Sequence, residues 1–468
     1  MKERVAIVFL TLSVAATLGL GGAVAYAFTH RGSTTFQTSG GAGQTYTTTN
    51  SGAPGGGGPT ITSGGHSSGP GASSGGGRKS NGGGGGSSSS HTGKPSSTSG
   101  AGTGVSKGVI TVGGIYDETG PVDATVERDT VRSYFDLVNS QGGVNGYKFR
   151  LLDCNSAYDP STAHQCSQKL TSEGVLAIVG WLSLSGEQPE AQYLTQQGIP
   201  IIGGLGVPAE FASPLSFPTT PSLVTQGTAL GTRACQTGLS KPGVIFLDAN
   251  FIAPVKQSFL DAMKKCGISP AGVETVAATK ADYTDIILKF QSAGAQSVAA
   301  FVDPFSYARI FQAMERQNWH PAVLGGGLDK ASANQQYASG CGSNCAVFGA
   351  DSATPVLEYL DHANTPSIAQ YLATVHKYYP SQYGALDAYT TYQWLAAEVL
   401  VQAVKNIGNN PVTRQSLVAS LDRLRNFDDG GITKPITYGS GNHDPLHCLQ
   451  WIHNTNGHWK TQSSWNCF

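Results

Sequence analysis

Short apolar runs alternate with helical patterns along residues 109–206, and each run ends in glycines or small polar residues. The runs are rich in branched side chains and too short for helices, which is typical of strands buried on both faces. Between them, apolar residues recur at helical spacing. Three strand-to-strand crossovers in succession predict a doubly wound lobe built on a parallel sheet. The expected strands are residues 109–115, 148–153, 175–180 and 199–204.

The same alternation returns after residue 217 and predicts a second lobe of the same kind. The expected fold class is therefore α/β, with two doubly wound parallel-sheet lobes. Parallel strands gather their carboxyl ends at one edge of a sheet, so we expect a ligand site in a cleft between the lobes. The expected helices are 223–235, 255–265, 283–293 and 307–316, and the expected strands are 243–248, 273–277, 297–302 and 322–326.

Composition separates the N-terminal part of the chain from this body. Many of the 62 glycines crowd into residues 29–107, which are almost only Gly, Ser, Thr and Pro. Such a stretch buries too little apolar area to offset its conformational entropy, so it is interpreted as a disordered tether. Residues 1–28 combine Lys2 and Arg4 with a long apolar run. They are either a signal peptide cleaved after Ala27 or an uncleaved membrane anchor, and the tether favours the anchor.

Five motifs in the body carry a family resemblance. They are Thr119-Gly120-Pro121, Asn139-Ser140-Gln141-Gly142-Gly143-Val144-Asn145-Gly146, Tyr158-Asp159-Pro160, Gly180-Trp181-Leu182-Ser183 and Gln188-Pro189. Together they resemble the leucine/isoleucine/valine-binding proteins, which are type I periplasmic solute-binding receptors of ABC importers. The resemblance covers nearly all of the chain after residue 107. It implies a periplasmic binding protein-like I fold, in which a three-strand hinge lets two lobes close around a ligand.

The resemblance also implies how the later part of the chain is divided. Lobe I is expected to comprise residues 108–222 and 354–430, and lobe II residues 223–353 and 431–468. Lobe I then receives a long amphipathic helix over 387–407. A strand pair at 432–438 and 448–453 is expected to cross back to lobe II, and the hinge is expected near 220–225, 351–355 and 428–434.

The family holds its ligand with hydroxyls and backbone amides that follow the third and fourth strands, and with an acid on lobe II. Helix N-termini suit anions, so the loop at 183–186 is expected to cradle a carboxylate. Carried over to this chain, the ligand-binding candidates are Thr125, Trp181, Ser183, Leu184, Ser185, Leu205, Gly206, Val207, Phe251, Phe305, Gly327 and Asp329.

Several of these positions depart from the family pattern. Leu184 stands where the family has a serine, Val207 where it has a threonine, and Thr125 where it has a tyrosine. The ammonium-binding acid corresponds to Gly327, with Asp329 nearby. These changes remove most of the charge recognition that an α-amino acid needs, so we expect a less polar or differently charged small molecule.

Structural roles compete with ligand binding at these positions. Trp181 could be a core aromatic side chain under the loop. Phe251 and Phe305 could line the hinge without touching a ligand. Ser183 and Ser185 could be helix N-caps, a role that is compatible with an anion site.

All eight cysteines lie in the body, which favours disulfides in an exported chain, although eight cysteines allow 105 connectivities. A zinc site at Cys341 and Cys345 lacks a nearby histidine to complete it. The near-neighbour pairs are Cys154 and Cys166, Cys235 and Cys266, Cys341 and Cys345, and Cys448 and Cys467.

The charge and the motifs of the sequence exclude several classes of function. A net charge of -1 with 13% charged residues argues against a nucleic-acid partner. The sequence contains no nucleophile elbow, HExxH motif or Walker loop, so we expect no enzyme, no cofactor and no metal. A cluster of possible ligands from His443 to His458 is interpreted as a surface hairpin.

The expected function is an extracytoplasmic receptor that delivers a small molecule to ABC permease subunits. The alternative is a membrane-tethered ligand sensor that signals to a partner protein. An enzyme or an adhesin that reuses the fold is the third class, because a fold alone does not determine function.

Overall fold

The computed structural model describes residues 104–330, 345–441 and 443–468. The predicted N-terminal segment, most of the predicted tether and Cys341 lie outside the described residues. Every described residue belongs to one compact unit of the chain. Among the described residues, no helix is both long and apolar enough to cross a membrane.

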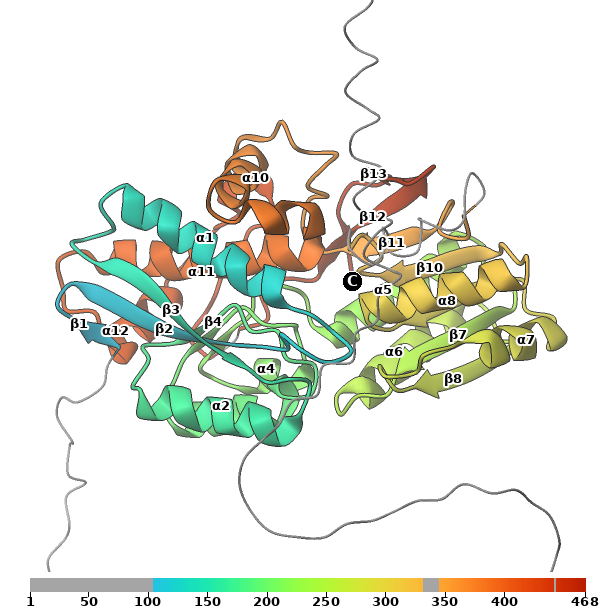
Figure 1. Cartoon of the computed structure of the whole chain (residues 1–468), viewed down its shortest axis with the longest axis horizontal. Helices are drawn as coiled ribbons and strands as arrows, with labels where there is room; N and C mark the ends of the chain where they lie inside the picture. The colour runs from blue at the N-terminus through green and yellow to red at the C-terminus, as the bar shows by residue number, and fades with distance from the viewer. Residues whose placement is uncertain (1–103, 331–344, 442) are drawn as a thin grey trace, which may run out of the picture. The chain divides into compact units, whose positions relative to one another are not determined.

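The first sheet is the one predicted from residues 109–206 (Figure 1). Its strands run parallel except for β1, which pairs antiparallel with β2 although its residues were assigned to the tether. The strands are β1 (Val105–Ser106), β2 (Val109–Tyr116), β3 (Lys148–Asn155), β4 (Ile178–Val179), β5 (Ile201–Ile202) and β6 (Ser216–Phe217). The helices are α1 (Thr125–Ser140), α2 (Pro160–Ser172), α3 (Glu187–Gln196) and α4 (Pro208–Ala212).

Two of these strands, β4 and β5, end earlier than predicted because glycines with positive φ follow them. Gly180 has φ 66° and Gly203 has φ 75°, a region that side chains with a Cβ rarely adopt. The backbone therefore turns out of the sheet directly after β4 and β5. Both turns lead into the loops that were predicted to hold the ligand.

The second sheet has the order β13-β12-β11-β10-β9-β7-β8, with β14 paired to β12. Its strands from β7 to β11 are parallel, whereas β12 pairs antiparallel with β11, β13 and β14, so this sheet is mixed. The strands are β7 (Pro242–Leu247), β8 (Gly272–Val276), β9 (Ser297–Phe301), β10 (Ala322–Gly326), β11 (Asp351–Thr354), β12 (Cys448–Thr455), β13 (His458–Thr461) and β14 (Asn466–Cys467). The helices are α5 (Leu223–Gln236), α6 (Ile252–Lys265), α7 (Thr284–Ser292) and α8 (Pro304–Arg316).

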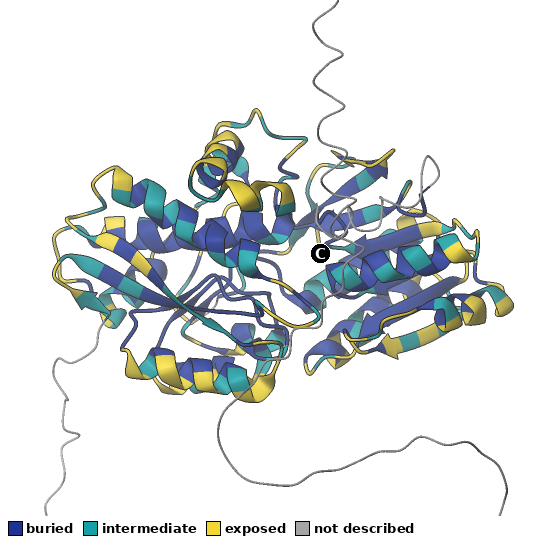
Figure 2. Cartoon of the chain, viewed as in Figure 1, coloured by how far each residue is buried: buried dark blue, intermediate teal, exposed yellow. Residues whose placement is uncertain are grey.

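The helical region near the C-terminus packs on the first sheet. Its central helix, α11 (Ala388–Ile407), contacts α1, β4 and β5 and is buried on nearly every side (Figure 2). The prediction of an amphipathic helix is therefore wrong, since Lys405 and Asn406 are the only exposed residues of α11. The neighbouring elements are α10 (Pro366–Tyr378), η1 (Pro380–Ala385), α12 (Arg414–Leu421) and η2 (Asp429–Gly431).

The chain passes between the two sheets three times, after β6, after β11 and before β12. The third passage differs from the prediction, because residues 432–438 do not form a strand of the second sheet. Ile436 makes only an isolated bridge to Phe427. The Tyr438 hydroxyl donates to the Pro218 carbonyl at 2.8 Å, which keeps this segment with the core of the first sheet. The chain leaves that core only after Leu446.

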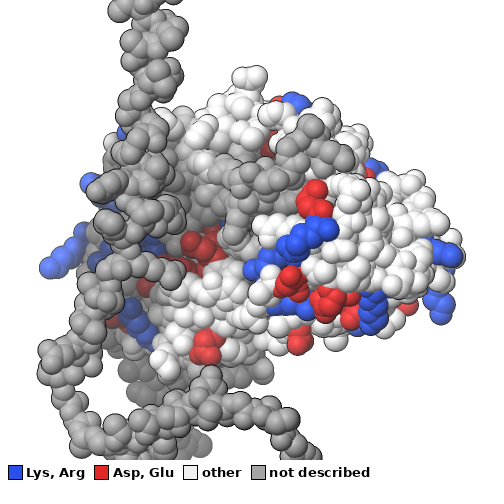
Figure 3. Space-filling view, turned by 45° about the vertical axis from the view of Figure 1, so that its right-hand side comes forward, with Lys and Arg blue, Asp and Glu red and all other residues white. Residues whose placement is uncertain are grey.

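Charged side chains on the face shown in Figure 3 are intermixed rather than gathered by sign. Exposed ion pairs occur on the second lobe, including that of Arg316 with Asp282 at 2.6 Å. Such pairs contribute little to stability, because water and salt screen them.

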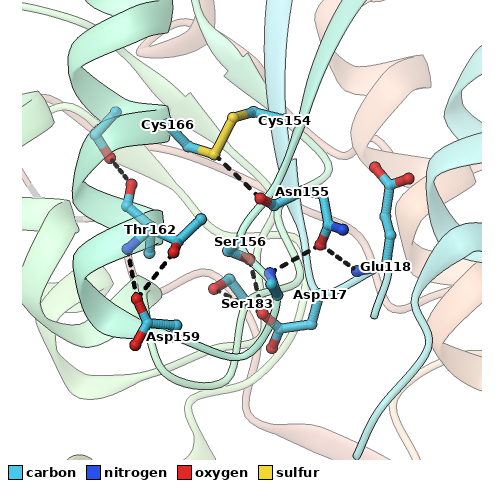
Figure 4. Close-up of a disulfide and its surroundings, with 12 residues drawn as sticks. Asp117, Glu118, Cys154, Asn155, Ser156, Asp159, Thr162, Cys166 and Ser183 are labelled. Carbon is cyan, nitrogen blue, oxygen red and sulfur yellow. Dashed lines mark hydrogen bonds between the residues drawn. A yellow bond between two sulfur atoms is a disulfide. The ribbon is translucent and has the colours of Figure 1, made fainter. Parts of the chain in front are cut away.

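Three predicted disulfides are confirmed. Cys154–Cys166 joins β3 to α2 (Figure 4), Cys235–Cys266 joins the ends of α5 and α6, and Cys448–Cys467 joins β12 to β14. Cys345 is also disulfide-bonded, and its predicted partner Cys341 lies outside the described residues.

Candidate functional site

A pocket lies between the two lobes, where the loops that follow strands of both sheets meet. This is the edge at which parallel sheets bind ligands. Its cavity volume is about 70 Å³. The first sheet and its helices contribute Val122, Asp123, Glu127, Leu182, Leu184, Leu205, Tyr389 and Tyr392, and the second lobe contributes Leu223, Gln226, Leu247, Phe251, Phe301, Val302, Asp303, Pro304, Phe305, Gly326 and Lys330.

Four of the residues predicted to bind ligand line this pocket: Leu184, Leu205, Phe251 and Phe305. They follow β4, β5, β7 and β9, as the strand pattern predicted, and Phe305 lies in the first turn of α8 (Pro304–Arg316). The other eight predicted residues are not among its lining residues. They are Thr125, Trp181, Ser183, Ser185, Gly206, Val207, Gly327 and Asp329.

Trp181 is fully buried in an apolar cluster with Ile115, Leu170 and Ala191. Its backbone carbonyl accepts a hydrogen bond from Gln393 at 3.1 Å. The next residue, Leu182, lines the pocket, because successive side chains of an extended segment point to opposite sides. The structure therefore places Trp181 in the core beneath the loop, which is the structural role considered above.

The loop amides that were expected to hold a ligand carboxylate bind carboxylates of this chain instead. The Ser183 amide donates to Glu187 Oε1 at 3.0 Å, and the Leu205 amide donates to Glu187 Oε2 at 2.8 Å. The Leu184 amide donates to Asp117 Oδ2 at 2.8 Å. The buried carboxylate of Glu187 thus accepts hydrogen bonds from amides of both loops that were predicted to hold the ligand.

The carboxylates of Asp117 and Glu210 accept further hydrogen bonds from residues of these loops. Asp117 also accepts the hydroxyls of Ser156 and Ser183, as Figure 4 shows. Glu210, on α4, accepts the amides of Gly206 and Val207 at 3.1 Å each. The local spacing of a glutamate three residues after Val207 is a helix-capping signal that could have revealed this second acid.

Burial and the repulsion of Glu210 raise the pKa of Glu187 well above its usual value. Burial likewise raises the pKa of Glu210 to about 7, against the opposing effect of its hydrogen bonds. Because two adjacent buried carboxylates repel each other, the pair retains a proton near neutral pH. The hydrogen bonds that hold the lobe I loops beside the pocket therefore involve a pair of glutamates whose protonation changes with pH.

We expect the stability of this protein to fall as pH rises from 5 to 8. The stability of a Glu210→Gln variant is expected to fall less over the same range. A raised pKa in the folded state means that folding favours the protonated form. That stability is complete below the unfolded pKa of 4.5 and is lost as pH rises through about 7. A shift of this size is worth about 3 kcal/mol for one group. Melting temperatures at pH 5 to 8 measure the effect, and equal slopes for both proteins would contradict it.

The lobe II loop after β10 holds a buried lysine that sequence analysis missed. Lys330 lines the pocket, and its ammonium donates to Glu127 Oε1 at 2.9 Å and to Asp387 Oδ2 at 2.8 Å. Burial alone would lower the pKa of Lys330, and the two carboxylates raise it above its usual value. No local sequence signal links these three residues, which meet only in the folded chain.

The two lobe II residues that were predicted near the ligand ammonium have other roles. Gly327 has φ 70°, and a Cβ at this position would lie 2.5 Å from the Tyr389 hydroxyl. Asp329 caps α11, because its Oδ2 accepts the Ala388 amide at 2.8 Å. Neither residue is among those lining the pocket.

The predicted hairpin histidines do not gather at one point. His443 lies 3.0 Å from Asp422 and stacks on Phe217 of the first lobe. His453 lies on β12, 2.7 Å from Asp351. In the part of the chain that the structure describes, no group of three His, Cys, Asp or Glu side chains could hold a metal ion.

A family model described as periplasmic binding protein matches residues 109–456, and the chain belongs to this family. Its members are solute-binding proteins rather than enzymes, and the family is extracytoplasmic. A leucine-, isoleucine-, valine-, threonine- and alanine-binding protein of Pseudomonas aeruginosa is 27% identical over 190 residues, covering 38% of this chain and 50% of the relative. A Leu/Ile/Val-binding protein homolog of Brucella melitensis is 23% identical over 207 residues, covering 40% and 53%. The chain thus spans about half the length of the curated relatives it matches.

Solved structures share the fold. A branched-chain amino acid ABC transporter protein from Thermus thermophilus with bound valine has a TM-score of 0.68 at 17% identity, covering 77% of this chain and 97% of that one. A fatty acid ABC transporter substrate-binding protein from Thermomonospora curvata has a TM-score of 0.67 at 18% identity, covering 78% and 94%. A solute-binding protein of R. palustris in complex with benzoate has a TM-score of 0.63 at 17% identity, covering 76% and 95%. The fold prediction is confirmed.

Proposed function

We propose that this chain is an extracytoplasmic receptor that captures a small, largely apolar molecule between its lobes and delivers it to an ABC importer. The observation that carries the proposal is the pocket itself, which loops after strands of both sheets line with apolar and aromatic side chains. Solved structures with this fold include one with bound valine, one in complex with benzoate and one of a fatty acid ABC transporter substrate-binding protein. These structures support a receptor role for the chain without identifying its ligand.

The internal caps support a ligand other than a standard amino acid. Glu187 occupies amides of both loops that the family resemblance assigned to the ligand carboxylate. An incoming carboxylate would therefore have to displace a buried carboxylate of the protein. Leu184, Leu205, Phe251 and Phe305 are the predicted residues that we retain as ligand contacts.

The predicted N-terminal roles form part of this proposal, as do the predicted lobe boundaries other than the one at residue 431, where the chain stays with the first core until Leu446. We propose that residues 1–28 hold the receptor at the membrane and that the Gly/Ser-rich tether gives the body reach toward its permease. A tether of this composition spans roughly 50 Å on average. The intact mass of the mature protein distinguishes retention of the segment from cleavage after Ala27.

The direct test of the receptor role is native mass spectrometry of the whole chain, purified with its disulfides formed, followed by denaturation. A small molecule that remains bound in the native state and is released on unfolding supports the proposal. A chain that carries no ligand, and that binds none from an extract of small metabolites, contradicts it.

We expect a Phe305→Ala variant to retain that ligand ten- to hundredfold less tightly than the wild type. The Phe305 ring lines the pocket, and burying one phenylalanine side chain is worth about 1.5–3 kcal/mol. Phe348→Ala is the matched control, because Phe348 is also partly buried against the same core but does not line the pocket. If ligand affinities measured by calorimetry fell equally in both variants, Phe305 would not be a ligand contact.

A further inference from the structure

The polar end of the pocket offers no free cation to a ligand. Among the described lining residues, Lys330 is the only lysine or arginine, and its side chain is 4% exposed. Both Glu127 and Asp387 already accept hydrogen bonds from its ammonium. A ligand carboxylate placed here would face two carboxylates for one lysine, which is unfavourable in a buried site.

One acid in the pocket has an unused acceptor. Glu127 is 2% exposed, and its Oε2 has no hydrogen-bond partner although the atom is buried. The two other acids in the lining are already engaged, because Asp303 accepts the Ser306 amide and Asp123 accepts the Thr125 amide. A buried carboxylate oxygen without a donor is costly, so Glu127 marks where a ligand donor would be stabilised.

The remaining walls suit an apolar body that carries a positive charge. Aliphatic and aromatic side chains from both lobes line most of the pocket, and aromatic rings attract cations that lie over their faces. Asp123, Glu127 and Asp303 outnumber the single lysine in the lining. The aromatic members of the lining are Phe251, Phe301, Phe305, Tyr389 and Tyr392.

We propose that the ligand is an apolar amine without a carboxylate, whose ammonium group donates a hydrogen bond to Glu127 Oε2. This inference rests on the proposed receptor function and specifies its ligand class. It joins three observations: loop amides capped by the protein's own carboxylates, a lysine that is already paired, and one unpartnered buried acceptor. The apolar body of the amine lies against the aromatic and aliphatic walls.

The ionisation of Glu127 makes binding depend on pH. Burial and the nearby Asp387 carboxylate raise the pKa of Glu127 to about 7, while Lys330 opposes the shift. Tyr371 on α10 and Tyr392 on α11 are the other titratable groups that face it. An ammonium ion is stabilised by the ionised carboxylate, so the affinity for an amine rises between pH 6 and pH 8. A neutral alcohol gains no such advantage.

The test uses four matched probes with the whole chain, freed of any co-purified molecule. They are 3-methylbutylammonium, 3-methylbutan-1-ol, 4-methylpentanoate and L-leucine, which differ mainly in the polar group. Isothermal calorimetry at pH 8 is expected to show the ammonium binding at least tenfold more tightly than the alcohol, with no binding of the carboxylate or of leucine. Equal affinity for the alcohol, or tighter binding of the carboxylate, would overturn the proposal.

A Glu127→Gln variant separates this contact from general electrostatics. The amide oxygen can still accept from Lys330, so the fold is expected to persist. Affinity for the ammonium probe should fall at least tenfold and lose its pH dependence, while affinity for the alcohol changes less than threefold. Asp248→Asn is the control, because Asp248 is exposed just beyond β7 and does not line the pocket. An equal loss in both variants would contradict a specific contact.

Two further outcomes separate the ligand class from the receptor role. The pH profile of the wild type tests Glu127 even if the variant fails to fold. A co-purified acid or neutral molecule, together with no binding of the ammonium probe, would overturn the amine and leave the receptor function standing. The absence of any ligand in both experiments would overturn both.

Discussion

A Trp181→Ala variant is expected to lose about 3–5 kcal/mol of unfolding free energy, the usual cost of truncating a buried tryptophan. Trp181 is 0% exposed and packs among residues beneath the first sheet, so the truncation leaves a cavity that the surrounding core fills only partly. Denaturant unfolding measures the loss as a lower midpoint at unchanged slope. Trp319→Ala is the matched control, because Trp319 is only partly buried and should cost less.

This prediction also separates a core role from ligand contact. Trp181→Phe keeps an aromatic ring in the cluster and is expected to leave ligand affinity within about twofold of the wild type. If Trp181→Ala kept its stability but lost binding, Trp181 would belong to the site and its assignment to the core would be wrong.

A Lys330→Met variant is expected to lose about 3–5 kcal/mol of stability at neutral pH. Removing the lysine leaves Glu127 and Asp387 buried without their cation, and breaking a buried pair costs this much because the remaining charge is uncompensated. The loss should shrink toward pH 5, because the raised pKa of Glu127 lets this carboxyl become neutral there. Thermal unfolding at pH 5 and pH 8 measures both effects.

An exposed pair provides the control for Lys330. Lys289 pairs with Glu274 on the second lobe, and its side chain is 65% exposed. Lys289→Met is therefore expected to cost less than about 1 kcal/mol. A double variant, Glu127→Gln with Lys330→Met, should recover part of the loss. Equal costs for Lys330→Met and Lys289→Met would show that burial does not govern the pair.

The order of elements was predictable because each strand and helix carries its own local pattern. Val109–Tyr116 contains an apolar run with branched side chains, and it forms an interior strand of the first sheet, between β3 and β4. Asp303 followed by proline is a helix start signal, and α8 begins at Pro304 with the Asp303 side chain as its cap. The residues of each confirmed disulfide are also near neighbours in sequence.

The candidate site was only partly predictable. Strand ends identified the right loops, since Leu184, Leu205, Phe251 and Phe305 all line the pocket. The role of each side chain within a loop was harder to predict, because one residue can be buried in the core while the next one lines the pocket. Trp181 lies in the core and Leu182 lines the pocket. The apolar pattern of the sequence does not show which of the two faces the ligand.

The sequence by itself determined the α/β class, the two-lobed plan and the apolar character of the expected ligand site, because buried strands require continuous apolar runs and parallel strands require crossovers. Only the tertiary structure decided which polar groups the protein uses for its own stability. Lys330 meets Glu127 across 203 residues and Asp387 across 57, distances over which no local pattern operates. Burial then decides the chemistry, because a charge removed from water must find a partner within the fold.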